Sequence, residues 1–173
     1  WGWVVAFFCT VWLQLAVSSL FPPGRAAPDL FLVAAIALGL LRGLGPGIAA
    51  GLLLGLTGDL IVGRLVGLGG LTLAMAGGLA GVVTRRVFRD NLVVVGAIAL
   101  VLGLLSVAVY ASLGWVLGVK YSTWRALLAI GLPVGVSTSL LVPAVYAAGF
   151  RSLNKPEQGL PERRLISGGD AGE

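Results

Sequence analysis

Long uncharged stretches alternate with short charged ones along the whole sequence. A helix that spans a membrane needs about 20 mostly apolar residues, with a range of about 17–25. Four of the uncharged stretches are long enough on their own; the second and third are shorter, and a tight turn at residues 42–47 separates the helices they predict. The stretches without Asp, Glu, Lys or Arg are residues 1–24, 30–41, 43–58, 65–84, 91–119 and 126–150. With their helix-compatible flanks, they predict helices at 3–21, 29–42, 46–63, 67–86, 91–117 and 124–149.

The composition places these helices in a membrane. Of the 173 residues, 58% are apolar and only 11% are charged, whereas soluble domains carry about 25% charged residues. We therefore predict an all-α integral membrane protein with six transmembrane helices in one domain, residues 1–153. Residues 154–173 are rich in Pro, Gly and charge, and such a segment cannot bury enough apolar surface to fold, so we expect a flexible cytoplasmic tail. The chain opens on Trp1, so we expect native residues before it.

The distribution of basic residues predicts the orientation, because Lys and Arg are enriched on the cytoplasmic side of membrane proteins. The loops after the second and fourth predicted helices and the tail hold Arg42, Arg85, Arg86, Arg89, Arg151, Lys155, Arg163 and Arg164. The other three loops hold only Arg25, Arg64, Lys120 and Arg125. Both termini are therefore expected in the cytoplasm.

Several classes of chemistry lack the residues that they need. The chain has no His and a single Cys, Cys9, so the commonest general base and the usual metal-binding clusters are missing. No phosphate-binding loop, nucleophile elbow or dinucleotide fingerprint occurs. The net charge of +5 is spread between apolar stretches and the tail, which is typical of a membrane protein, not of one that binds nucleic acid. We therefore expect that the protein is not an enzyme and binds no cofactor or metal.

Small residues recur at every fourth position through the first half of the chain. Residues four apart share one face of a helix, and glycine there lets membrane helices approach closely. We expect most of these glycines to pack the helices of this chain together; the alternative is a groove for a helix of another protein. The series is Gly39, Gly43, Gly47, Gly51, Gly55, Asp59, Gly63 and Gly67.

Two acidic residues lie at or inside predicted helices. Asp59 continues the glycine series, and a carboxylate at the centre of a membrane helix costs about 2.5–3.5 kcal/mol on insertion scales. Interfacial solvation or pairing with Arg64 would relieve most of this cost. We favour a structural role, paired with a loop or terminal N–H, over proton or cation binding. Asp29 follows Pro28 at the start of the second helix, where an acidic side chain caps the helix and interacts favourably with its dipole.

Two other features offer candidate surfaces. The last predicted helix carries Pro133 and Pro143 around residues 137–139, and their hydroxyl groups are expected to satisfy backbone carbonyls freed by the prolines. The first helix has a bulky stripe that either faces lipid or meets a partner helix. The stripe is Trp1, Val5, Phe8, Trp12 and Leu15.

Read in order, three motifs between residues 28 and 91 resemble the rod shape-determining MreD family of bacteria. Residues 28–32, Pro-Asp-Leu-Phe-Leu, resemble the family's P-D-L-x-L opening of the second helix. Residues 55–68 resemble its G-x-x-x-D-L-x-x-G-x-x-x-G-L segment, although Arg64 and Gly69 stand where the family often has Ser and His. Residues 85–90, Arg-Arg-Val-Phe-Arg-Asp, resemble its basic stretch after the fourth helix.

The resemblance implies a non-enzymatic subunit of the cell-elongation machinery in the bacterial inner membrane. Such a subunit would bind MreC, through its transmembrane helix and membrane-proximal region, and work with MreB, RodA and a class B penicillin-binding protein in peptidoglycan synthesis. The family's fold is similar to the S-components of energy-coupling-factor transporters, so the alternative is a small-molecule receptor. The polar residues available for a receptor pocket are Asp59, Arg64, Thr72, Tyr110, Ser137, Thr138 and Ser139.

Overall fold

The structure, a computed structural model, describes residues 2–21, 27–63, 67–84, 91–116 and 124–153. These residues form six α-helices and no strand. The all-helical prediction is therefore confirmed, and the described helices begin and end close to the expected positions. The helices are α1 (Gly2–Leu20), α2 (Leu30–Arg42), α3 (Leu44–Val62), α4 (Leu68–Thr84), α5 (Leu92–Val116) and α6 (Trp124–Leu153).

Two helix boundaries differ from the prediction for physical reasons. Only Gly43, with φ of 94°, separates α2 from α3, and α3 begins at Leu44 instead of residue 46. Pro46 is thus inside the first turn, where its missing N–H is not needed. α6 continues to Leu153, four residues beyond the predicted end, because the charge at Arg151 ends the apolar stretch without breaking the helix.

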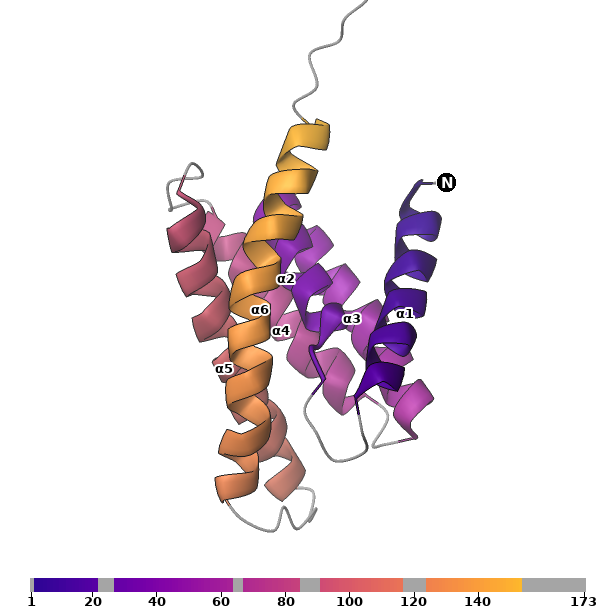
Figure 1. Ribbon diagram of the computed structural model, residues 1–173, viewed down its shortest axis with the longest axis vertical. Helices are drawn as coiled ribbons and strands as arrows, with labels where there is room; N and C mark the ends of the chain where they lie inside the picture. The colour runs from indigo at the N-terminus through magenta and orange to yellow at the C-terminus, as the bar shows by residue number, and fades with distance from the viewer. Residues whose placement is uncertain (1, 22–26, 64–66, 85–90, 117–123, 154–173) are drawn as a thin grey trace, which may run out of the picture.

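α2 is the central helix of the bundle. It contacts the α3–α4 pair on one side and α6 on the other, while α5 packs on α6 and α4 (Figure 1). α1 packs mainly on α2 at the edge of the bundle. Figure 1 shows the N-terminus and the C-terminal end of α6 at the same end of the bundle, as an up-and-down arrangement of these helices requires.

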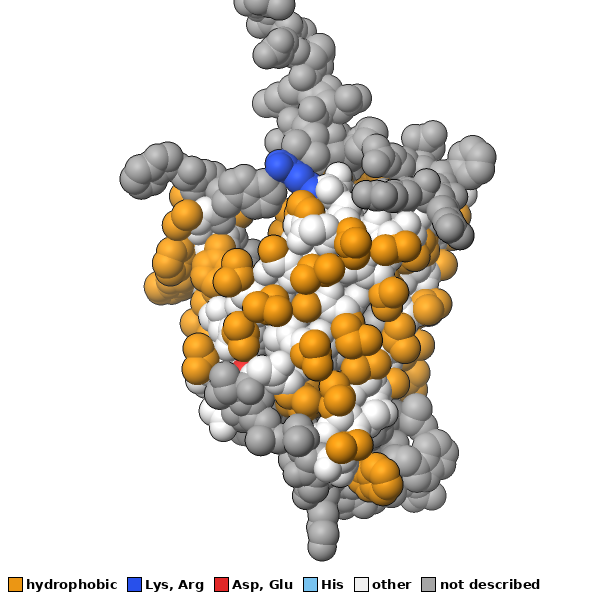
Figure 2. Space-filling model, turned by 180° about the vertical axis from the view of Figure 1, so that it is seen from behind, with side chains coloured by type: hydrophobic (Ala, Val, Ile, Leu, Met, Phe, Trp, Pro, Cys, Tyr) orange, Lys and Arg blue, Asp and Glu red, His pale blue; other side chains and the backbone are white. Residues whose placement is uncertain are grey.

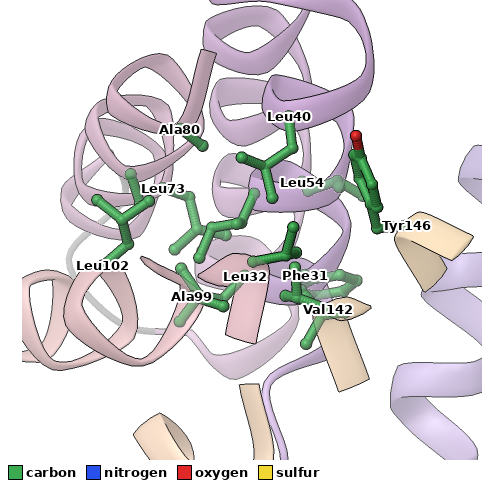
Figure 3. Close-up of a cluster of buried hydrophobic side chains, with 14 of the residues drawn as sticks. Phe31, Leu32, Leu40, Leu54, Leu73, Ala80, Ala99, Leu102, Val142 and Tyr146 are labelled. Atoms are coloured by element: carbon green, nitrogen blue, oxygen red, sulfur yellow. The ribbon is translucent and has the colours of Figure 1, made fainter. Parts of the chain in front are cut away.

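The hydrophobic core surrounds α2. Leu32 and Ile36 are almost fully buried, and Figure 3 shows Leu32 among side chains from α4, α5 and α6, including Leu73, Ala99 and Val142. Eight of the 13 residues of α2 are buried. A helix that is apolar on every side is typical of such an enclosed position, so the short α2 is stabilised by its neighbours.

The glycines of α3 form its contact with α4. A Cβ added at Gly47 would overlap the carbonyl of Gly77, and one at Gly51 would overlap the carbonyl of Leu73. At Gly55 the added atom would lie 2.6 Å from the Cα of Gly70. The close backbone contact that small residues permit is therefore made within this chain, as favoured from the sequence. These three glycines do not form a groove for another protein.

The prolines of α6 are accommodated differently from the expectation. Pro143 leaves the carbonyl of Ser139 without its helical donor, yet the hydroxyls bond elsewhere. Ser137 donates to the carbonyls of Pro133 and Val134 at 2.6 and 3.1 Å, and Thr138 donates to Val134 at 2.6 Å. These bonds lie within one turn of the same helix, so the predicted repair of carbonyls freed by proline is wrong for these hydroxyls.

The surface is that of a protein surrounded by an apolar medium. Three described segments are long and apolar enough to span a membrane, namely Leu44–Val62, Leu92–Val116 and Gly131–Gly149. The other described helices are apolar but shorter. Figure 2 shows apolar side chains spread over the described surface of one face, with basic side-chain atoms of a described residue visible near one end. Soluble monomers rarely expose extensive apolar surface, so this surface is consistent with a membrane protein.

The α3–α4 contact predicts the effect of one methyl group. Gly51→Ala is expected to lower the free energy of unfolding by about 1–3 kcal/mol, since overpacking forces the two backbones apart. Gly45→Ala is the matched control, because nothing lies within 4 Å of its added Cβ and alanine favours a helix over glycine. Unfolding in detergent, followed by circular dichroism, measures both. Equal stability of the two variants would contradict the close contact.

Candidate functional site

The carboxylate of Asp59 binds the beginning of the next helix. Its Oδ2 accepts hydrogen bonds from the backbone amides of Gly67 and Gly69, both at 2.9 Å, and of Gly70 at 3.3 Å. The first amides of a helix lack partners within the helix, and a negative charge there interacts favourably with the dipole. Asp59 is 6% exposed. This is the pairing with backbone N–H groups that the sequence favours.

Two glycines shape the corner between α3 and α4. Gly63 ends α3 in the left-handed conformation, with φ of 65°, which glycine adopts without the steric cost of a Cβ. Gly67 has φ of 105° directly before Leu68, the first residue of α4, and Leu68 is buried. The described parts of residues 55–68 thus have structural roles in this corner.

The carboxyl group of Asp29 caps α2 as predicted. Its Oδ1 accepts a hydrogen bond of 3.1 Å from the backbone amide of Leu32. Asp29 precedes the helix, and burial raises the pKa of its carboxyl, while hydrogen bonds from the amides of Leu32 and Phe31 offset part of this rise. Pro28 lies just before the cap.

Gln14 holds α1 against the start of α2, a contact that the sequence analysis missed. Its Oε1 accepts from the backbone amide of Leu30 at 2.7 Å. Its Nε2 donates to the carbonyl of Pro28 at 3.4 Å and to the hydroxyl of Ser18 at 3.2 Å. A lone amide within an apolar helix was the available signal, because a buried polar group requires partners.

A cavity of about 580 Å³ lies at the end of the bundle that contains Asp59 and Asp29. It is lined by the C-terminal halves of α1, α3 and α5 and by the beginnings of α2 and α4, with Val134 from α6. The helix lengths explain the hollow: α5 has 25 residues and α2 only 13, a difference of about 18 Å at 1.5 Å per residue. The longer helices extend past the shorter ones, as Figure 1 shows.

The cavity wall is mostly apolar with a few polar groups. Phe31, Leu32, Leu73, Val107 and Val134 contribute apolar surface. The polar lining residues are Gln14, Ser18, Asp29, Asp59, Thr72, Ser106 and Tyr110. Pockets with this combination, in the range of about 300–1,000 Å³, commonly bind small molecules.

The structure brings together some of the predicted pocket residues and separates others. Asp59, Thr72 and Tyr110 line the cavity. Ser137, Thr138 and Ser139 do not line it and bond to carbonyls of α6 itself. Arg64 and the basic cluster of Arg85, Arg86 and Arg89 lie outside the described residues.

The described residues contain no group of three His, Cys, Asp or Glu side chains that would hold a metal ion. Asp29 and Asp59 are the acidic residues of the cavity wall, and both already accept backbone hydrogen bonds. The arrangement is suited to positioning helices and to holding an organic group by shape and hydrogen bonds.

In comparisons with known proteins, no family model, no curated protein and no solved structure matches this chain.

The role of Asp59 predicts an order of severity. Asp59→Leu leaves three amides without their acceptor, and each unsatisfied buried donor costs about 1–3 kcal/mol. Asp59→Asn retains a carbonyl acceptor and should be clearly milder. The two variants can be compared by thermal unfolding and by the yield of monodisperse protein in detergent. If Asn is as damaging as Leu, the charge itself and not the acceptor is essential. A proton or ion flux in vesicles that Asn abolishes would instead indicate transport.

Proposed function

We propose that this chain is a non-enzymatic membrane subunit, similar to the MreD family, that acts by binding another membrane protein. The observation that carries the proposal is the segment from Gly55 to Leu68. The family's pattern is present there in order, and the described positions of that pattern have definite structural roles. Gly55 permits the close helix contact, Asp59 caps α4, and Gly63 and Gly67 adopt positive φ.

In the proposed topology, the chain crosses the bacterial inner membrane with six helices, and both of its termini lie in the cytoplasm. α2 is about 20 Å long at 1.5 Å per residue, shorter than the bilayer core of about 30 Å. A helix of this length is tolerated because the neighbouring helices surround α2, so the polar backbone at its ends is not exposed to lipid. The excess of basic residues in the second and fourth loops and the tail supports the orientation.

Binding through the membrane follows from which surfaces remain uncovered. The glycine face of α3 is used against α4, so it is not available to a partner. The stripe on α1 is exposed, with Trp12 at 75% and Phe8 at 58%, and α1 itself packs mainly on α2. The resemblance gives MreC as the partner, bound through its transmembrane helix and membrane-proximal region. MreB, RodA and a class B penicillin-binding protein would belong to the same assembly.

Reporter fusions test the topology. Fusions at Gly118 and at Lys155 are expected on opposite sides of the membrane, with Lys155 in the cytoplasm, because the loop basic residues differ by eight to four between the two sides. Alkaline phosphatase and green fluorescent protein report the outer and inner sides respectively. Both fusions on one side, or the tail outside, would contradict six spans.

Co-purification tests the partner. Full-length MreC should be recovered with this chain in detergent, whereas MreC with an unrelated transmembrane helix should be largely lost, because helix packing supplies most of the binding. The unrelated helix serves as the matched control for expression and insertion. Equal recovery of both proteins would place the contact outside the membrane, and recovery of neither would contradict MreC as the partner.

The cavity favours a second candidate function, a receptor for a small molecule. Its volume of about 580 Å³ and its mostly apolar wall with several polar groups suit a ligand. Its position near the predicted outer end of α1, α3 and α5 suits capture from the outer side. The two candidates use different surfaces of the chain, since one uses the exposed stripe of α1 and the other uses a cavity that shares only Leu15 with that stripe.

A further inference from the structure

We propose that the cavity binds a small amphipathic molecule with a protonated amine and an apolar body, the amine against Asp59 and the body against the wall of α2, α4, α5 and α6. The proposal rests on the second candidate function and specifies its ligand chemistry. It does not depend on MreC, because the contacts proposed here are made by α2, α3, α4, α5 and α6, and of the α1 stripe only Leu15 lines the cavity.

The unequal use of the two carboxylate oxygens of Asp59 points to the amine. All three backbone hydrogen bonds reach Oδ2, and none of the described residues donates to Oδ1. Among the described residues, no fully buried side-chain oxygen or nitrogen lacks a hydrogen bond. Asp59 lines the cavity and is 6% exposed, so a ligand in the cavity has access to its side chain.

The charges of the described lining residues favour a cation over an anion. The described lining residues include two carboxylic acids, Asp29 and Asp59, and no Lys or Arg. Apolar walls keep water away and strengthen electrostatic interactions inside. An ammonium group can donate to Oδ1 while leaving the three backbone bonds to Oδ2 in place, so binding does not disrupt the α3–α4 corner.

Other lining residues supply the rest of the site. Ser106 and Thr72 donate their hydroxyl protons to carbonyls of their own helices, Gly103 and Leu68. Tyr110 makes no such bond within the described residues, and it is half-buried in the lining. Its hydroxyl is thus available to a second polar group of the ligand. Phe31, Leu73 and Val107 provide apolar surface in the same cavity.

A series of three probes with one shape tests the charge. We would measure binding of 4-phenylbutylamine, 4-phenylbutanol and 4-phenylbutyrate by calorimetry at pH 7, with the whole chain in nanodiscs of zwitterionic lipid. The amine should bind saturably and at least about tenfold more tightly than the alcohol, because hydrogen bonds to charged groups are the stronger ones. The butyrate should bind most weakly.

A matched pair of variants distinguishes the cavity from the lipid. Ala111 lines the cavity, and Ala108 on the same helix faces outward. Ala111→Trp should abolish saturable binding by filling the space, whereas Ala108→Trp should retain it. Asp59→Asn should reduce the affinity for the amine about tenfold and leave that for the alcohol unchanged. If Asp59→Asn does not fold, Tyr110→Phe provides a second reading, with an expected loss of about two- to tenfold.

Two results would overturn the proposal in distinguishable ways. Equal binding of amine and alcohol, abolished for both by Ala111→Trp, would contradict the choice of a cation while leaving the cavity as a ligand site. No saturable binding of any probe, or binding that Ala111→Trp does not change, would contradict the ligand site and the receptor function together.

Discussion

Three backbone amides that converge on one oxygen of Asp59 determine how the rest of the bundle is arranged. The amides belong to the beginning of α4 and the carboxylate belongs to α3, so the bonds fix the turn between two helices. Without an acceptor these donors would be buried at a cost. The corner in turn brings Gly47, Gly51 and Gly55 against α4, and the α3–α4 pair forms the surface on which α2 packs.

The sequence predicts the parts of the structure that depend on local patterns. Helix positions follow from runs of apolar residues between charges, the close packing of the α3 face within the chain from glycines four residues apart, and the caps from acidic residues near helix ends. The predicted start of α3 at residue 46 is wrong, because Gly43 alone makes the turn. From the sequence, a proline in the first turn of a helix cannot be distinguished from a proline in the preceding loop. The prediction that the α6 hydroxyls bond to carbonyls freed by proline is wrong, because these hydroxyls bond to carbonyls one turn earlier in the same helix.

The cavity depends on information that no local pattern contains. Its wall combines residues as distant in sequence as Gln14 and Val134, and it lies where α5, with 25 residues, is much longer than α2, with 13. Asp59, Thr72 and Tyr110 could be picked as polar residues in apolar helices, and they line it. Ser137 and Thr138 are of the same kind and, like Thr72, bond within their own helix, but they do not line the cavity. The tertiary position of each residue separates these two groups.

Asp59 takes part both in the α3–α4 corner and in the cavity. One of its oxygens stabilises the corner, and the residue also forms part of the cavity wall. A carboxylate used only as a cap could be placed away from any open space, and one used only for a ligand would be costly to bury without partners. The three amides reduce this cost, because hydrogen bonds stabilise a buried charge. The hydrogen bonds of the α3–α4 corner therefore stabilise a carboxylate beside a mostly apolar cavity.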